Sequence, residues 1–176
     1  MDDRVVDIAR GWLGTPYVHQ ASVRGVASDC LGLIRGIWRE LYGAEPEEAP
    51  PYTPDWGEFG PREVLMEGTM RHLRPAVAAG EALAPGQVLL FRMLEGAVAK
   101  HLGVVSTAGE AARFIHAYTH HGVIDSPLTP PWQGRIVARF RFPGGGGRFH
   151  PEPWPELTCP ARRPSALRDE ANDYPP

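Results

Sequence analysis

The change of hydrophobic period at Pro85-Gly86 is the feature that most constrains the fold of this chain. Before this pair, apolar residues recur at the three- and four-residue spacing of amphipathic helices. After it, short apolar or alternating runs separated by turn residues are typical of β-strands. A block of helices followed by a block of strands favours an α+β fold, with helices packed on an antiparallel sheet, over an alternating βαβ arrangement.

The first block contains three expected helices. They cover about residues 3–13, 30–42 and 63–74. Asp29 is a suitable N-cap for the second helix and Gly43 a suitable stop, and Gly32 and Gly36 allow another backbone to approach it closely. Residues 15–28 and 44–61 lack a sustained period, so we expect loops there. The second loop contains aromatic residues at positions 52, 56 and 59.

About five strands are expected in the second block, and together they form the sheet. They cover about residues 87–92, 100–107, 112–119, 122–126 and 135–142. The first is apolar throughout, which is typical of a strand buried on both faces. The last alternates and predicts Ile136, Ala138, Phe140 and Phe142 inward, and Arg135, Val137, Arg139 and Arg141 outward.

The composition changes sharply after Pro143. Eight prolines and a run of four glycines fall within the last 34 residues. This bias favours an extended segment over a packed core. We therefore expect one domain over residues 1–143 and a Gly/Pro-rich extended tail over residues 144–176, in which Trp154 is a docking candidate and Cys159 has no evident partner.

Charge and cysteine content exclude several classes of function. The formal net charge of −3 argues against nucleic acid or an anionic membrane as a partner. The first residues contain no long apolar run, so we expect neither a signal peptide nor a transmembrane helix, and synthesis in the cytoplasm. Two cysteines in different contexts do not suggest a disulfide scaffold. The sequence predicts no cofactor and no metal.

Cys30 opens the strongly patterned helix of residues 30–42 and is therefore a candidate nucleophile. A helix N-terminus presents unpaired N–H groups and a positive dipole end, which predicts a lowered thiol pKa. The alternative is a buried structural cysteine, because Cys30 also lies on the apolar face of the helix. That face comprises Cys30, Leu33, Ile34, Ile37, Trp38 and Leu41.

Two histidines on successive strands favour the catalytic interpretation. His101 begins one expected strand and His116 lies within the next, so antiparallel pairing lets both approach one end of the helix that Cys30 opens. A cysteine nucleophile needs a histidine base, and that base needs a polar orienting group. The alternatives are core histidines, or a zinc site made of His116, His120 and His121 with Asp125.

Four separated motifs resemble the NlpC-type (NlpC/p-sixty superfamily) cell-wall cysteine peptidases. They are Asp29-Cys30-Leu31-Gly32-Leu33, the Pro85-Gly86 turn before a strand, His101-Leu102-Gly103-Val104-Val105 and Ile115-His116-Ala117. The resemblance covers residues 5–126 and implies a papain-like core. It further implies Cys30 as nucleophile, His101 as general base and His116 as orienting residue. It gives Tyr17 an oxyanion or substrate role and Asp29 a capping role beside the nucleophile.

The resemblance also implies a substrate and a setting. The expected reaction is hydrolysis of an amide in the peptidoglycan stem peptide, usually between D-γ-glutamyl and a diamino acid. The form of the cysteine motif is similar to peptidases of phage tails and gene-transfer particles, which implies carriage in such a particle, action in the periplasm or cell wall, and tail or baseplate proteins as partners of residues 144–176. Leu31 and His19-Gln20 depart from the family pattern of Ser and Trp-Gly, which alters the cleft wall.

Two other functions compete with this one. The first is a catalytically silent tail-assembly or wall-binding module of the same fold, supported by an outward aromatic segment around Tyr52 and Trp56 and by the long tail. The second is acyl transfer or hydrolysis of a different amide by the same residues. Rapid thiol labelling of Cys30 near neutral pH would favour an enzyme over the silent module.

Overall fold

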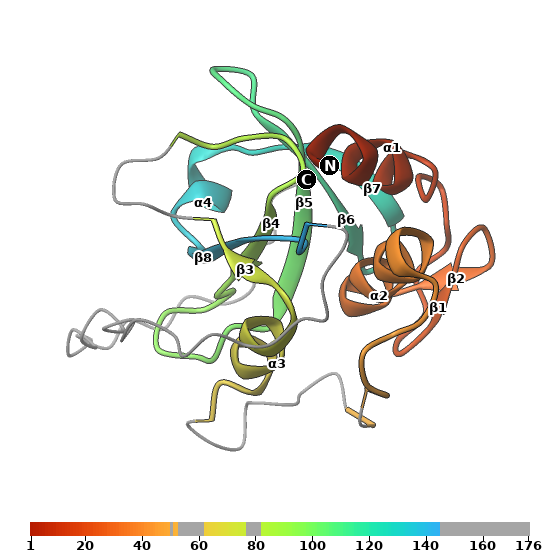
Figure 1. Ribbon diagram of the computed structural model, residues 1–176. Coiled ribbons are helices and arrows are strands. Elements are labelled where there is room, and N and C mark those ends of the chain that lie inside the picture. Colours follow the sequence, from red (N-terminus) through yellow and green to blue (C-terminus); the bar gives the residue numbers. More distant parts are fainter. Residues whose placement is uncertain (50, 53–61, 77–81, 145–176) are drawn as a thin grey trace.

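Helices come first and the main sheet second, as the change of period predicts (Figure 1). The computed structural model describes residues 1–49, 51–52, 62–76 and 82–144. The helices are α1 (Asp2–Arg10), α2 (Cys30–Tyr42), α3 (Val64–His72) and α4 (Pro130–Gln133). The strands are β1 (Ser22–Val23), β2 (Ala27–Ser28), β3 (Arg74–Pro75), β4 (Val88–Phe91), β5 (His101–Thr107), β6 (Arg113–Tyr118), β7 (Gly122–Pro127) and β8 (Ile136–Arg141).

Helix α2 has the predicted bounds because both of its ends are specified locally. The Asp29 carboxylate accepts a hydrogen bond from the Gly32 N–H at 2.7 Å, which makes Asp29 a side-chain N-cap. Gly43 ends the helix with a φ of +90°, a conformation that favours glycine. A Cβ added at Gly32 would lie 1.9 Å from the Ala21 carbonyl oxygen. The predicted close approach of a second backbone is therefore confirmed at Gly32, whereas Gly36 leaves space for the side chain of Trp12.

The six strands of the main sheet pair antiparallel in the order β3-β8-β4-β5-β6-β7. Strands β4 to β7 follow one another along the chain, whereas β8 returns to pair with β4 and with the two-residue β3. Register pairs include Leu90 with Leu102 between β4 and β5, and Val104 with Ile115 between β5 and β6. The predicted helices on an antiparallel sheet are confirmed, with one short edge strand added.

The sheet carries a separate hydrophobic cluster on each face. Helices α1 and α2 cover one face, where Trp12, Leu33 and Ile37 pack against residues of β4, β5 and β6. Trp132 of α4 packs on the other face against Phe91 and Phe114. Burial of apolar residues on both faces explains why β4 is apolar throughout.

Three details differ from the sequence-based expectations. Residues 15–28 contain the β1-β2 hairpin, where a loop was expected. A strand of two residues is too short to show a hydrophobic period in the sequence. Helix α4 was not expected. Val137 was predicted to point outward, but it packs against the core because the β4-β8 register shifts between Leu90 and Phe91.

Several expectations lie outside the described residues. These are the aromatic residues Trp56 and Phe59, the docking candidate Trp154, Cys159 and nearly all of the expected tail. Among the described residues, no helix is both long and apolar enough to cross a membrane.

Candidate active site

The predicted site residues line one cleft, at the end of the sheet where β5 begins and β6 ends and where α2 starts. Tyr17, Asp29, Cys30 and His101 all contribute to its wall. His116 is fully buried behind His101 and is not part of the wall. The other lining residues are His19, Tyr52, Met93, Lys100, Ala117, Tyr118 and Thr119. The fold thus brings together residues that are far apart in the sequence, from Tyr17 to Thr119.

Cys30 is the first residue of α2 and is partly buried against the core. Burial, together with the neighbouring Asp29 carboxylate, raises the pKa of the thiol to about 12. Backbone N–H groups of Leu102, Leu31 and Cys30 itself act in the opposite direction and do not compensate. The prediction of a lowered thiol pKa was wrong, because desolvation outweighs the helix N-terminus here.

The Cys30 thiol forms its hydrogen bond with the backbone of Lys100, the residue before the expected base His101. Cys30 Sγ donates to the Lys100 carbonyl oxygen at 3.9 Å, rather than to a ring nitrogen of His101. A thiol that donates is a protonated thiol, which agrees with the raised pKa. Before its proton can pass to His101, the thiol must therefore break its hydrogen bond with the Lys100 carbonyl oxygen.

The two histidines are joined by a direct hydrogen bond and continue to a third side chain. His101 Nε2 lies 2.8 Å from His116 Nδ1, and His116 Nε2 lies 3.0 Å from Ser126 Oγ on β7. This arrangement leaves Nδ1 as the His101 nitrogen available to a proton from the cleft. The predicted neighbouring position of His101 and His116 on paired antiparallel strands is found.

Aromatic rings surround the histidine pair. His101 lies 5.8 Å from the ring of Phe91 and 5.7 Å from that of Trp132, measured between centroids. His116 stacks on Phe114 at 4.3 Å, with 25° between the ring planes. Burial in these surroundings lowers the pKa of His101 to about 4. Burial and then the nearby His101 lower the pKa of His116 to about 2.

The structure explains why the motif has a glycine, Gly103, two residues after His101. It lies two residues beyond His101 on β5, on the same face of the sheet. A Cβ added there would lie 2.7 Å from Cδ2 of Phe114 and 3.2 Å from Cβ of His116. Gly103 therefore leaves the space in which His116 and its stacking partner reach His101.

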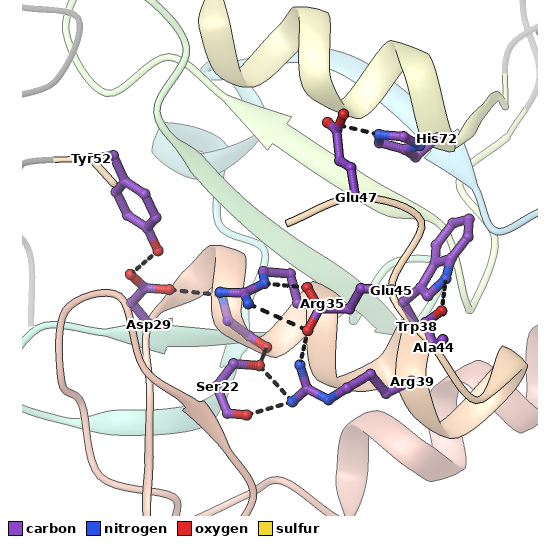
Figure 2. Close-up of polar contacts among 11 residues, drawn as sticks. Ser22, Asp29, Arg35, Trp38, Arg39, Ala44, Glu45, Glu47, Tyr52 and His72 are labelled. Atoms are coloured by element: carbon purple, nitrogen blue, oxygen red, sulfur yellow. Dashed lines mark hydrogen bonds and ion pairs between the residues drawn. The ribbon is translucent and has the colours of Figure 1, made fainter. Parts of the chain in front are cut away.

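Asp29 is saturated with hydrogen bonds from its surroundings. Besides capping α2, its carboxylate accepts a hydrogen bond from the Tyr52 hydroxyl (Figure 2) and another from the Gln20 N–H at 2.7 Å. The Tyr52 carbonyl in turn receives His19 Nε2 at 2.8 Å and the Gln20 amide. Tyr52 was expected to belong to an outward aromatic segment. Its hydroxyl points instead into the site, because Asp29 supplies a buried acceptor.

His19 and Gln20, which stand where the NlpC-type pattern has Trp-Gly, both contact Tyr52. His19 and Gln20 fix the backbone of Tyr52, and the His19 and Tyr52 rings meet edge to face at 4.9 Å. Tyr17, just before them, is held by a backbone bridge to Ser28 and by a side-chain hydrogen bond with Thr119. Burial raises the pKa of the Tyr17 hydroxyl. This hydroxyl remains a proton donor at neutral pH.

Ion pairs behind the cleft fix α2 relative to its neighbours (Figure 2). Arg35 Nε lies 2.7 Å from the Glu45 carboxylate, which Arg39 also contacts. Arg39 donates further to the carbonyl and hydroxyl oxygens of Ser22 on β1. Burial alone would raise the pKa of Glu45, but the hydrogen bonds and charges of Arg35 and Arg39 together lower it. The middle and C-terminal part of α2 are thereby held against the β1-β2 hairpin and against Glu45.

The structure does not assemble the alternative zinc site. Both ring nitrogens of His116 face other partners, His101 and Ser126. His120 and His121 lie on the exposed side of the turn after β6. Within the described residues, no group of three or more His, Cys, Asp or Glu side chains is arranged to hold a metal ion.

Sequence comparison alone finds no relative. No family model matches the chain, and no curated protein matches it. Solved structures with the same fold are found. One is an NlpC/P60 family protein from Bacillus cereus, 20% identical with a TM-score of 0.54, and the match covers 81% of this chain and 40% of that one.

Two further neighbours agree with it. NlpC1 from Trichomonas vaginalis is 19% identical with a TM-score of 0.54, over 80% of this chain and 44% of that one. A protein similar to a lipoprotein of the NLP/P60 family from Staphylococcus aureus is 20% identical with a TM-score of 0.52, over 80% and 41%. This chain thus spans about two fifths of the length of each. The part of the chain that matches has the papain-like fold of NlpC/P60 proteins.

Proposed function

We propose that this chain is a cysteine peptidase of the NlpC/P60 kind that hydrolyses an amide bond in the peptidoglycan stem peptide. The observation that supports it is the meeting of Cys30, at the start of a helix, with His101 in one cleft, while His116 is hydrogen-bonded to His101 from behind. These are the three groups that thiol peptidases require: a nucleophile, a base and an orienting group.

In the first half of the reaction the nucleophile is formed as it is used. A thiol pKa of about 12 and an imidazole pKa of about 4 make both groups neutral at pH 7. The Cys30 S–H proton passes to His101 Nδ1 while the sulfur attacks the carbonyl carbon. The Tyr17 hydroxyl and the Cys30 N–H stabilise the negative oxygen of the tetrahedral intermediate. His101 then gives the proton to the leaving amine, and a thioester remains.

In the second half, water completes the hydrolysis. His101 accepts a proton from a water molecule that attacks the thioester carbon. The sulfur leaves, takes that proton back as a thiol and releases the carboxylic acid product. His116 accepts the His101 Nε2–H throughout and so fixes the ring in the orientation that presents Nδ1 to the cleft.

The finer parts of this proposal come from the sequence resemblance. The bond is the one between D-γ-glutamyl and a diamino acid, and the enzyme is carried by a phage-like tail or gene-transfer particle. Residues 144–176 contact tail or baseplate proteins, and the enzyme acts in the periplasm or cell wall. Acyl transfer to another amine, or hydrolysis of another amide, would use the same residues and differ in the products.

Digestion of purified peptidoglycan tests the activity and the bond together. The wild-type protein should release fragments whose new amine and carboxyl termini identify the cleaved bond, and Cys30→Ala should release none. Cys159→Ala serves as the matched control and should behave as wild type. Release of the same fragments by Cys30→Ala, or no release by the wild type, would overturn the proposal.

A further inference from the structure

Ser126 ends the hydrogen-bonded series that starts at the cleft, and the mechanism above assigns it no role. It lies on β7, where the residue opposite His116 is Ile124, so Ser126 is the diagonal neighbour of His116 on the same face. Its hydroxyl oxygen is 3.0 Å from His116 Nε2. Ser126 is partly buried, and its hydroxyl can either accept a proton from His116 Nε2 or donate one to it.

Two proton arrangements satisfy these contacts when both imidazoles are neutral. In the first, His101 Nε2–H donates to His116 Nδ1, and His116 Nε2–H donates to Ser126 Oγ. In the second, every direction is reversed, so Ser126 O–H donates to His116 Nε2 and His116 Nδ1–H donates to His101 Nε2. Each neutral imidazole carries one proton, and therefore the direction of one bond fixes the direction of the other.

Only the first arrangement lets His101 act as a base toward the cleft. There His101 Nδ1 carries no proton and can accept one from the thiol. In the reversed arrangement Nδ1 already carries its proton, and the ring can only donate. The hydroxyl at position 126 therefore bears on the chemistry at Cys30 through two intervening rings.

We propose that Ser126 is a positioning residue that accepts the His116 Nε2–H proton and thereby keeps His101 in the Nε2–H tautomer, with Nδ1 free to take a proton. This inference rests on the proposed function for its effect on rate. Its effect on the tautomers does not depend on any substrate.

The test compares Ser126→Thr with Ser126→Val in the full-length chain. The two side chains have nearly the same shape and suit a strand equally, but only threonine keeps the hydroxyl. Nitrogen-15 NMR of the imidazole rings reports directly which ring nitrogen of His101 and His116 carries the proton. Steady-state hydrolysis of a soluble stem-peptide fragment, with thermal unfolding alongside, gives kcat, KM and stability.

We expect wild type and Ser126→Thr to show Nε2–H tautomers at both histidines and similar kcat values. Ser126→Val should populate the Nδ1–H tautomer and lose about tenfold to hundredfold in kcat with little change in KM, by analogy with the loss seen when the partner that orients a metal-bound histidine is removed. Nδ1–H tautomers in the wild type would overturn the inference, and so would unchanged tautomers in Ser126→Val. Because the wild-type spectrum alone decides the first point, a Val variant that fails to fold leaves the test intact. An error in the proposed function would be detected separately, because the Cys30→Ala variant would then still hydrolyse the substrate.

Discussion

Cys30 and His101 face one cleft from walls of different chemistry. On the cysteine side, the Asp29 carboxylate is satisfied by backbone N–H groups and a tyrosine hydroxyl, so the wall is polar and charged. On the histidine side, Phe91 and Trp132 surround the ring. Both walls favour the neutral form of their reactive group, the first through burial and a like charge, the second through burial alone. Both groups are therefore neutral at pH 7, and in the proposed mechanism an ion pair forms only as bonds change.

Of the changes to the two walls, removal of the proposed base His101 should have the largest effect on kcat. His101→Gln should lower kcat by about 10³ or more with little change in KM, because the thiol loses its proton acceptor. His72→Gln on α3 is the control and should leave kcat unchanged. Steady-state hydrolysis of a soluble stem-peptide fragment measures both. A His101→Gln variant that keeps more than a tenth of wild-type kcat would rule out the assigned role.

The histidine wall should also make the fold sensitive to acid. The folded pKa of His101, about 4, lies below the ordinary value of 6.5, so the unfolded chain takes up this proton first as the pH falls. Stability is therefore fully present above about pH 6.5 and is lost as the pH approaches 4. Linkage gives a loss of about 2.5 kcal/mol between pH 7 and 4.5 from this group. Because His116 also has a lowered pKa and contributes a loss of its own, urea unfolding of wild type and His101→Gln at the two pH values measures the His101 contribution as the difference between their losses. Equal losses in the two proteins would refute the assignment to His101.

Trp132 allows the aromatic side of the comparison to be changed alone. Trp132→Leu should admit water to the histidines and raise the pKa of His101 toward 6.5, with a stability cost of about 2–4 kcal/mol from the cavity. Trp38→Leu is a matched control, because Trp38 is equally buried, with 9% of its surface exposed, but packs on the other face of the sheet. It should cost similar stability and leave the His101 pKa at about 4 in an NMR titration. Equal pKa values in the two variants would contradict the comparison.

A change in the polar wall, at Tyr52, should have the smallest effect on activity. Tyr52→Phe removes one hydrogen bond to a carboxylate that keeps its backbone donors, so we expect about 1–2 kcal/mol of lost stability and a few-fold lower kcat/KM. Tyr42→Phe is the control, because it also removes one tyrosine hydrogen bond, to the Pro143 carbonyl, away from the cleft. It should lower the melting temperature without changing kcat/KM. A change of kcat/KM in both variants would mean that Tyr52 has no special relation to the site.

The elements that position the site follow from local sequence signals. Helix α2 was predictable because Asp29 caps it and Gly43 ends it, and β5 and β6 because their apolar runs lie between turn residues. Neighbouring hairpin strands also predicted that His101 and His116 meet. The exposed or buried direction of Val137 was not predictable, because a register shift in a partner strand decides it.

Other parts of the site depend on contacts that no local pattern reports. Trp132 follows Thr129-Pro130-Pro131, a combination typical of a helix start, but a helix of four residues is too short to show a hydrophobic period. Ser126 becomes a neighbour of His116 only through the register of β6 and β7. The thiol pKa was predicted in the wrong direction, because burial and Asp29 act together more strongly than the helix N-terminus.

The identity of the nucleophile can be tested most directly by trapping the thioester. A stem-peptide fragment is mixed with the enzyme, the reaction is quenched in acid, and the intact mass and the modified peptide are determined. Our account predicts an acyl group on Cys30 in the wild type, more of it when deacylation is slowed, and no such adduct in Cys30→Ser, a variant without turnover. An acyl group mapped to another residue, or wild-type turnover by Cys30→Ser, would contradict it.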